Sequence, residues 1–309
     1  MRILYFLVSG LLAVYFGGCA LHPLPKDYAR VPTVKITKHI RCETQRALHS
    51  ILVDYLIEFD DVRTSQLGRA LKSGSEQLSA GLKGRIHPLA KKRIERFQES
   101  VIGYAFRFKI TEDNDNSGGM TLSMPFTNGS VAVALAGGKK KTRDNTRKFK
   151  IVETLEATAL DLDCSSTPSQ RQNLIYPIAG NIGMEEVLLT FINLSLDGTL
   201  KPEKKDVSEF SEQLTFTTKL SGSIKPTLKL DPVSDRWRVT EATGTFASAR
   251  TDLHEVTVAL KLPTIDDGKA VKKTKAQRQR AAKKSVKRTL KDVELERLDA
   301  ALRRLEESQ

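Results

Sequence analysis

Side chains that could carry catalytic or metal chemistry are scattered along this sequence rather than gathered in motifs. The five histidines form no H-x-x-x-H or H-E-x-x-H pattern, so no local spacing supports a zinc site. The sequence contains no G-x-S-x-G nucleophile motif, although distant residues can assemble a catalytic triad in space. We therefore predict no cofactor and no metal ion, and we turn to the thiols of the three cysteines.

The first cysteine follows an apolar N-terminal segment. Arg2 is the only charged residue among the first 25, and residues 3–16 are almost entirely apolar, too short to cross a bilayer as a helix. The letters FGGC at residues 16–19 place two glycines directly before Cys19. This segment resembles a bacterial lipoprotein signal with its lipobox, which implies cleavage before Cys19 and acylation of that residue. An ordinary cleaved signal or an uncleaved anchor is the alternative.

The lipoprotein resemblance also implies a location and bears on the other two cysteines. Ala20 after the acylated residue implies the periplasmic face of the outer membrane, with the inner membrane or the cell surface as alternatives. If Cys19 carries lipid, Cys42 and Cys164 are left as one possible disulfide in an oxidising compartment. Closing a loop of about 120 residues would stabilise the fold by about 4–5 kcal/mol. Two buried free thiols are the alternative.

The positive charge of the chain is concentrated near its C-terminus. The formal net charge is +13, and residues 269–291 contain eleven basic and no acidic residues, so this segment alone contributes +11. The nearly neutral remainder gives no support to nucleic-acid binding. We predict that the segment binds an anionic envelope surface, and a solvated flexible linker is the alternative. Its basic residues are Lys269, Lys272, Lys273, Lys275, Arg278, Arg280, Lys283, Lys284, Lys287, Arg288 and Lys291.

Three short motifs have weak functional interpretations. Residues 113–118 (DNDNSG) begin like a calcium loop, but its twelfth position is Met124, so we interpret them as a hairpin turn. Residues 136–142 (AGGKKKT) are only distantly similar to a phosphate loop, and we interpret them as a basic turn. Residues 180–183 (GNIG) precede an expected helix, whose backbone N–H groups could hold an anion, although a simple turn is the preferred interpretation.

Hydrophobic periodicity predicts the elements that position these residues. Three- and four-residue spacing indicates amphipathic helices at residues 43–60, 184–196 and 286–307, and a short helix starting near Pro88. Period-two alternation indicates half-buried antiparallel strands. These strands cover residues 104–111, 120–126, 131–135, 149–151, 214–220, 228–230, 237–239 and 256–262. The predicted fold class is α+β, a mainly antiparallel sheet body with flanking helices and a C-terminal amphipathic helix.

The chain then divides into four parts. We predict a signal peptide at residues 1–18, a lipidated extended tether at 19–37, a β-rich α+β body at 38–263, and a basic tail with a helix at 264–309. We expect a non-enzymatic, membrane-anchored envelope lipoprotein with a structural or binding role. Its partners would be the membrane and either an anionic surface or a protein that pairs with the C-terminal helix.

Two other functions stay open. The first is an envelope enzyme whose site is assembled in space, which would need a deep pocket with converging carboxylates. The second is a small-ligand or lipid carrier of the envelope. Its sheet would enclose an apolar cavity lined by Phe106, Phe108, Phe126 and Leu135.

Overall fold

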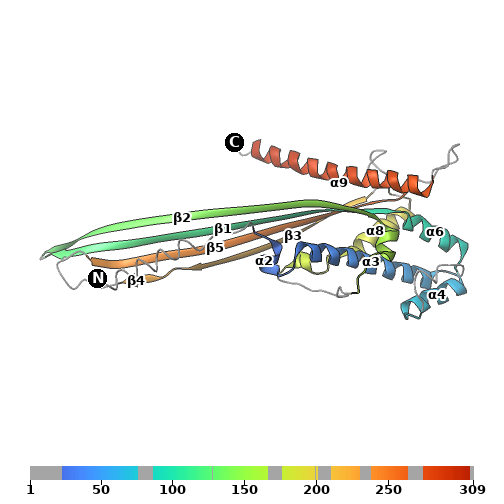
Figure 1. The fold of residues 1–309 in the computed structure, drawn as a ribbon, viewed down its shortest axis with the longest axis horizontal. Helices are drawn as coiled ribbons and strands as arrows, with labels where there is room; N and C mark the ends of the chain where they lie inside the picture. The colour runs from blue at the N-terminus through green and yellow to red at the C-terminus, as the bar shows by residue number, and fades with distance from the viewer. Residues whose placement is uncertain are drawn as a thin grey trace. The chain divides into compact units, whose positions relative to one another are not determined.

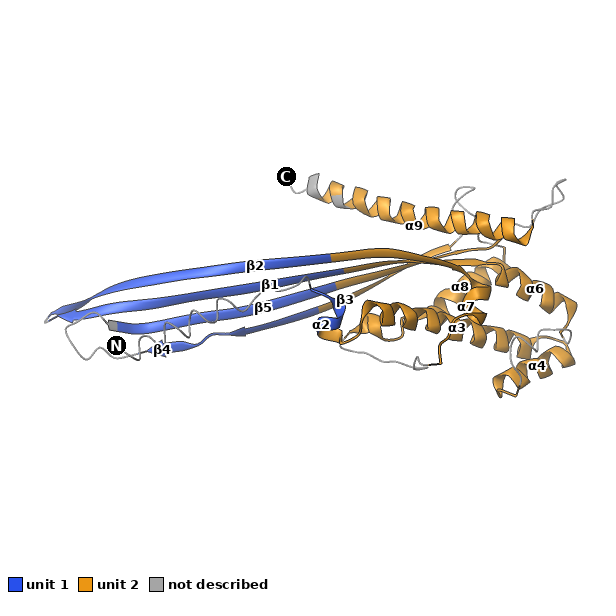
Figure 2. Ribbon diagram, viewed as in Figure 1, with its two compact units in different colours: residues 1–27, 109–145, 219–252 blue, residues 28–108, 146–218, 253–309 orange. Residues whose placement is uncertain are grey.

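The computed structural model describes residues 23–75, 86–126, 128–165, 176–198, 200, 210–229, 238–263 and 274–306. The chain forms two compact units, which Figure 2 distinguishes by colour. Unit 1 comprises residues 1–27, 109–145 and 219–252, and unit 2 comprises residues 28–108, 146–218 and 253–309. Strands and helices, one of them at the C-terminus, confirm the predicted α+β fold class (Figure 1).

The strands form one antiparallel sheet with the order β2-β1-β5-β3, and β4 also pairs with β5. They are β1 (Val101–Phe126), β2 (Gly129–Thr154), β3 (Phe210–Ile224), β4 (Thr227–Lys229) and β5 (Arg238–Lys261). The register of β4 places Leu228 opposite Ala242. The long strands contribute residues to both units.

Strands β1 and β2 are each continuous over 26 residues, whereas the sequence predicts shorter strands separated by turns. The expected hairpin turn at residues 113–118 lies inside β1, and the expected basic turn at residues 136–142 lies inside β2, so both interpretations are wrong. In these polar stretches, which lack alternating apolar residues, polar side chains of β1 and β2 contact each other across the strands. For example, the Thr142 hydroxyl donates to Asp113 at 2.6 Å.

Several helices agree with the periodicity of the sequence. The helical elements are α2 (Pro25–Ala29), α3 (Thr33–Glu58), α4 (Val62–Lys72), α6 (Pro88–Gln98), α7 (Leu155–Leu160), η1 (Pro177–Ala179), α8 (Met184–Leu196) and α9 (Lys275–Glu306). Helix α6 begins at its predicted proline, and α8 has its predicted bounds. Helix α4, which the sequence did not reveal, starts after Asp61, whose side chain accepts the N–H of Thr64 at 2.9 Å.

The N-terminal helices begin earlier than predicted. Helices α2 and α3 occupy most of the described part of residues 19–37, the predicted extended tether, so this part is helical. Pro32 stands at the N-cap of α3, where its missing N–H leaves no helical hydrogen bond unmade. Ile36 and Ile40 are fully buried, so the first turns of α3 belong to the core.

Helices cover both faces of the sheet in unit 2. On one face, Tyr104, Phe106 and Phe108 of β1 join the main hydrophobic core with residues of α3 and α8. On the other face, Val101 of β1 packs with Val286 of α9. The strands of this unit are therefore buried on both sides, which explains their runs of large apolar residues.

A glycine in β1 allows α9 to approach the sheet closely. A Cβ atom added at Gly103 would lie 2.3 Å from Val286 Cγ1 and 3.0 Å from Leu290 Cδ1. No larger residue fits at this position unless the helix moves away.

Unit 1 consists mainly of the strand segments at residues 109–145 and 219–252. Within it, the largely buried side chain of Arg250 binds two carboxylates. The Arg250 side chain is 11% exposed and donates to Asp252 at 2.7 Å and to Glu112 at 3.1 Å. It also donates to the carbonyl oxygen of Leu24 at 2.9 Å. These bonds connect β5, β1 and the described N-terminal residues within this unit.

We predict that Gly103→Ala lowers the free energy of unfolding by about 1–3 kcal/mol, because the new methyl group overpacks the contact with α9. Gly137→Ala is the matched control in β2, since a Cβ atom there meets nothing within 4 Å. Urea unfolding followed by circular dichroism measures both variants. Equal stability of the two variants would contradict the close packing at Gly103.

Candidate functional site

The predicted basic tail is helical from Lys275 onward. The flexible-linker interpretation is therefore wrong for residues 275–291. Ala282, Val286 and Leu290 recur every four residues and are buried against β1 and β5. This spacing was present in the sequence, but the run of charge concealed it.

Two of the predicted anion-binding residues hold α9 in place. Arg278 makes a double hydrogen bond to Glu99, at 3.0 Å and 2.8 Å. Lys275 forms an ion pair with Glu156 at 2.8 Å. These cations contact the body of unit 2 instead of facing an external anion.

The outward side of α9 carries a continuous row of residues, which we call the outer stripe. It consists of Arg280, Lys284, Lys287, Lys291, Leu295, Leu298 and Leu302. At 100° per residue these positions fall within a sector of about 80°, whose centre lies about 140° around the helix from the centre of the buried line. All seven side chains are exposed, and none of them is acidic. The outer stripe thus begins with cations and ends with leucines.

The apolar residues of the helix are distributed differently from the prediction. The sequence places Leu290, Val293, Leu298, Leu302 and Leu305 on one broad face. Leu290 is buried, whereas Leu298 and Leu302 are 52% and 57% exposed, so the sheet contact divides the set between two sides. The side chain of Leu305 lies outside the described residues.

The other predicted basic residues are placed as follows. Arg288 is exposed and Lys283 is half-buried, both beside the outer stripe. Four residues that the sequence singled out lie outside the described part of the chain, namely Cys19, Lys269, Lys272 and Lys273.

We predict that replacing Lys284, Lys287 and Lys291 together with Gln changes the free energy of unfolding by no more than about 0.5 kcal/mol, because exposed side chains contribute little. The same variant should lose retention on an anionic matrix at low salt. Arg278→Gln should instead cost about 1 kcal/mol, because it leaves Glu99 without its partner. Urea unfolding and column retention distinguish the two effects. A triple variant as unstable as Arg278→Gln would assign the outer stripe to the fold.

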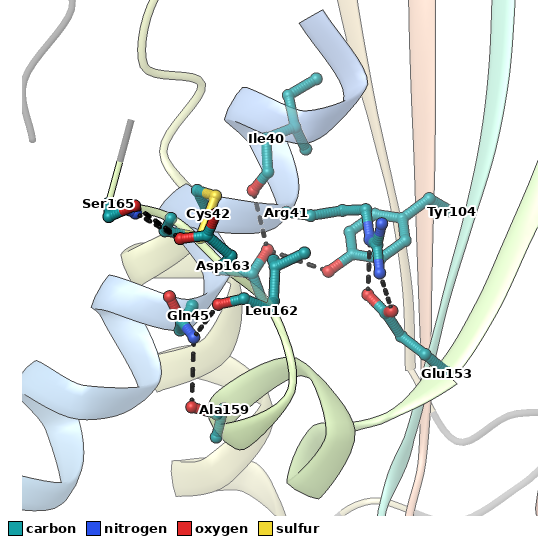
Figure 3. The surroundings of a disulfide bond; sticks show 12 residues. Ile40, Arg41, Cys42, Gln45, Tyr104, Glu153, Ala159, Leu162, Asp163 and Ser165 are labelled. Carbon is teal, nitrogen blue, oxygen red and sulfur yellow. Dashed lines mark hydrogen bonds and ion pairs between the residues drawn. A yellow bond between two sulfur atoms is a disulfide. The ribbon is translucent and has the colours of Figure 1, made fainter. Parts of the chain in front are cut away.

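The structure joins Cys42 and Cys164 in a disulfide, with Cα atoms 5.6 Å apart (Figure 3). This is the pair that the lipoprotein resemblance implied. The bond connects α3 to the segment after α7, across a sequence separation of 122 residues. Beside it, the Gln45 side chain donates to the carbonyl oxygen of Leu162 at 2.9 Å, which fixes the same segment.

Neighbouring residues of α3 contact two strands (Figure 3). Arg41 donates to Glu153 of β2 at 3.0 Å, and this hydrogen bond raises the pKa of the Arg41 guanidinium. Tyr104 of β1 donates to the Thr44 hydroxyl at 2.9 Å. Burial raises the pKa of the Tyr104 phenol, so this group stays protonated and keeps its donor.

A carboxylate of the protein itself binds at residues 180–183, the turn whose N–H groups could hold an anion. The Glu43 carboxylate accepts the backbone N–H groups of Ile182, Gly183 and Met184 at 2.8–3.1 Å. Gly183 has φ of 91°, a left-handed conformation that favours glycine. The carboxylate thus caps α8 and occupies the position an external anion would need. No local signal in the sequence reveals a partner 139 residues away.

We predict that Glu43→Ala lowers the free energy of unfolding by about 2–4 kcal/mol, because three backbone N–H groups, two of them buried, lose their acceptor. Glu43→Gln keeps one carbonyl oxygen and should lose less. Glu58→Ala, an exposed position on the same helix, is the matched control and should be nearly neutral. Thermal and urea unfolding measure all three. A Glu43→Ala variant as stable as the control would contradict this capping role.

A groove of about 520 Å³ lies between α9 and the sheet of unit 2. Its lining includes Phe106 and Phe149, whose rings stack with centroids 4.9 Å apart. Lys148 and Glu294 also line it and form an ion pair at 2.8 Å. The hydrogen bond from Lys148 lowers the pKa of the Glu294 carboxyl, so this carboxyl stays ionised at neutral pH.

The four residues expected to line a carrier cavity do not enclose one. Phe106 and Phe108 are 2% and 1% exposed and pack against each other in the core of unit 2. Phe126 and Leu135 are 54% and 53% exposed in unit 1. The expectation of this particular cavity is therefore wrong.

Two kinds of feature are absent from the part of the chain that the structure describes. Among the described residues, no group of three or more His, Cys, Asp or Glu side chains is arranged to hold a metal ion. In the same part of the chain, no helix combines the length and the apolar character that a membrane crossing requires. The absence of a cofactor stays a prediction.

Comparison with known proteins identifies the family. The family described as uncharacterised protein y4kA matches residues 22–309, so this chain belongs to that family. One relative is uncharacterized protein y4kA of Sinorhizobium fredii (strain NBRC 101917 / NGR234). It is 27% identical over 257 residues, which cover 80% of this chain and 80% of the relative.

Solved structures give only remote similarities. The Salmonella SPI-1 type III secretion injectisome secretin InvG in the open gate state has a TM-score of 0.24 and 8% identity, covering 54% of this chain and 62% of that chain. The atomic model of the injectisome basal body proteins InvG, PrgH and PrgK has a TM-score of 0.26 and 8% identity, covering 58% and 49%. This chain thus spans less than two thirds of those chains, and similarities at this level support no conclusion.

Proposed function

We propose that this chain is a non-enzymatic lipoprotein of a bacterial cell envelope. Acyl chains on Cys19 anchor it at the periplasmic face of the outer membrane. The β-rich body is held at the membrane, and the outer stripe of α9 binds an anionic envelope surface, such as lipid headgroups or peptidoglycan carboxylates.

The pairing of Cys42 with Cys164 is the observation that carries this proposal. The chain has three cysteines, so this pair leaves Cys19 as the one cysteine outside an internal disulfide. Disulfides persist in oxidising compartments, which supports export of the chain. Acylation of Cys19 after its signal-like segment accounts for the odd thiol.

The energetics of such an anchor are favourable. Each buried methylene contributes about 0.8 kcal/mol, and stable attachment needs two membrane-binding signals. A cysteine with more than one acyl chain meets this requirement. Each cation of α9 that lies within a Debye length of an anionic surface, about 10 Å at 0.1 M salt, would contribute about 1 kcal/mol to binding.

The test is metabolic labelling of cells that express the chain. Labelled palmitate should enter the wild type and should be absent from Cys19→Ala. Cys42→Ala is the matched control, because it removes a thiol without removing the acylation site, and it should keep the label. Membrane fractions should contain the labelled protein. Equal labelling of wild type and Cys19→Ala would overturn the proposal.

A further inference from the structure

The hairpin formed by β1 and β2 in unit 1 contains a long uncharged stretch. Residues 116–138, which are 23 positions, contain no Asp, Glu, Lys or Arg, although 28% of the whole chain is charged. Asp115 precedes this stretch and Lys139 follows it. The stretch covers the hairpin end, where β1 stops at Phe126 and β2 begins at Gly129.

The pairing of the two strands assigns their side chains to faces. Thr142 contacts Asp113 through its hydroxyl, and a Cβ atom at Gly138 would lie 3.2 Å from Ser117 Cβ. In both pairs the residue numbers sum to 255, so the register is constant along this part of the hairpin. Residues opposite each other share a face of the sheet, and successive residues alternate between faces.

One face of the hairpin collects the bulky apolar side chains, and we call it the apolar face. It consists of Met120, Leu122, Met124, Val131, Val133 and Leu135. Met120 is 46% exposed, and Val131 and Val133 are 45% and 43% exposed. The other face of the same strands carries smaller side chains, at Thr121, Ser123, Pro125, Ser130, Ala132, Ala134 and Ala136. A contiguous exposed patch of this kind marks an interaction surface.

Cations border the apolar face on the same side of the sheet. Lys139 and Lys141 continue the odd-numbered positions of β2, so they share the face of Val131 and Val133, and both are exposed. Lys140 lies on the opposite face. An apolar patch with an adjoining pair of lysines complements a surface that is anionic outside and apolar beneath.

We propose that the apolar face binds an anionic lipid bilayer. Its side chains lie at the boundary between headgroups and acyl chains, and Lys139 and Lys141 contact anionic headgroups. Strand β2 is terminal in the described sheet, so its outer backbone groups have no partner strand among the described residues. Unpaired backbone groups do not enter the hydrocarbon core. The hairpin therefore lies along the interface and does not span the bilayer.

This surface is independent of the proposed lipoprotein function. It uses neither Cys19 nor the outer stripe of α9, and its test compares the two faces of one strand in the same protein. A failed palmitate experiment would therefore leave this result unaffected, and a failed hairpin experiment would leave the labelling result unaffected.

The experiment places a fluorescent probe on each face of β2 in the full chain. Val133→Trp reports on the apolar face, and Ala134→Trp is its matched control on the opposite face. Vesicles of phosphatidylethanolamine and phosphatidylglycerol carry bromine atoms on their acyl chains, which quench nearby tryptophan. The wild type gives the background from Trp237. We expect quenching of Val133→Trp and none of Ala134→Trp. Val131→Trp provides a second probe, and circular dichroism checks the fold of each variant.

Charge variants test the headgroup contact. Lys139→Gln in the Val133→Trp protein should raise the lipid concentration for half-maximal quenching about fivefold, since one lysine near an anionic surface contributes about 1 kcal/mol. Lys140→Gln, on the opposite face, should leave this concentration unchanged. Vesicles of phosphatidylcholine alone should abolish the difference.

Two outcomes would overturn the proposal. The first is equal quenching at positions 133 and 134, or quenching at neither position. The second concerns quenching of Val133→Trp by aqueous acrylamide. If this quenching weakens as the protein concentration rises, and bromolipids do not quench the same residue, the proposal fails. That second result would assign the apolar face to contact between copies of this chain.

Discussion

Five consecutive residues of α3 bind the elements of unit 2 to one another. Their partners are Glu153 of β2 for Arg41, Cys164 for Cys42, the N-terminus of α8 for Glu43, Tyr104 of β1 for Thr44, and the Leu162 carbonyl for Gln45. A helix turns once every 3.6 residues, so five successive side chains point in every direction around the axis. Four elements are reached in this way, namely β2, the segment after α7, α8 and β1, since Cys164 and Leu162 belong to the same segment.

The disulfide lies within this set of contacts, and that position connects the fold to its proposed compartment. Hydrogen bonds from Gln45 and to Thr44 hold the surrounding segments where Cys42 and Cys164 meet. Closing so long a loop restricts the unfolded chain and stabilises the folded one by several kcal/mol. Such a bond contributes only where thiols are oxidised, so the stability of unit 2 would depend on the oxidising compartment that we propose.

Sequence periodicity predicted elements whose apolar face is local, and it missed elements that depend on distant partners. Helix α8 was predicted with its observed bounds because its apolar spacing is complete within the segment. The polar middle of β1 was misread as a turn, since it is held by cross-strand contacts such as Thr142 with Asp113. The GNIG turn suggested an anion, but Glu43 lies far away in the sequence, so only the structure could identify it.

The basic composition of the tail likewise predicted its net charge, but not which of its basic side chains contact the body and which face solvent. Contact of Val286 and Leu290 with the sheet decides which cations face outward, and Gly103 makes that contact possible. Arg278 forms hydrogen bonds to Glu99, whereas the side chains of Lys284 and Lys287 are exposed. The packing of Ala282, Val286 and Leu290 therefore decides which cations of the tail are available to bind a partner, and its net charge does not.

The chemical state of the three cysteines in protein purified from membranes tests the proposed acylation of Cys19 and the disulfide together. Thiols are alkylated without prior reduction, and mass spectrometry then reads the peptides that contain Cys19, Cys42 and Cys164. We expect no alkylated cysteine, a cross-linked Cys42–Cys164 peptide, and an N-terminal Cys19 that carries the mass of its acyl chains. A chain that retains Met1 and is alkylated at all three cysteines would contradict both.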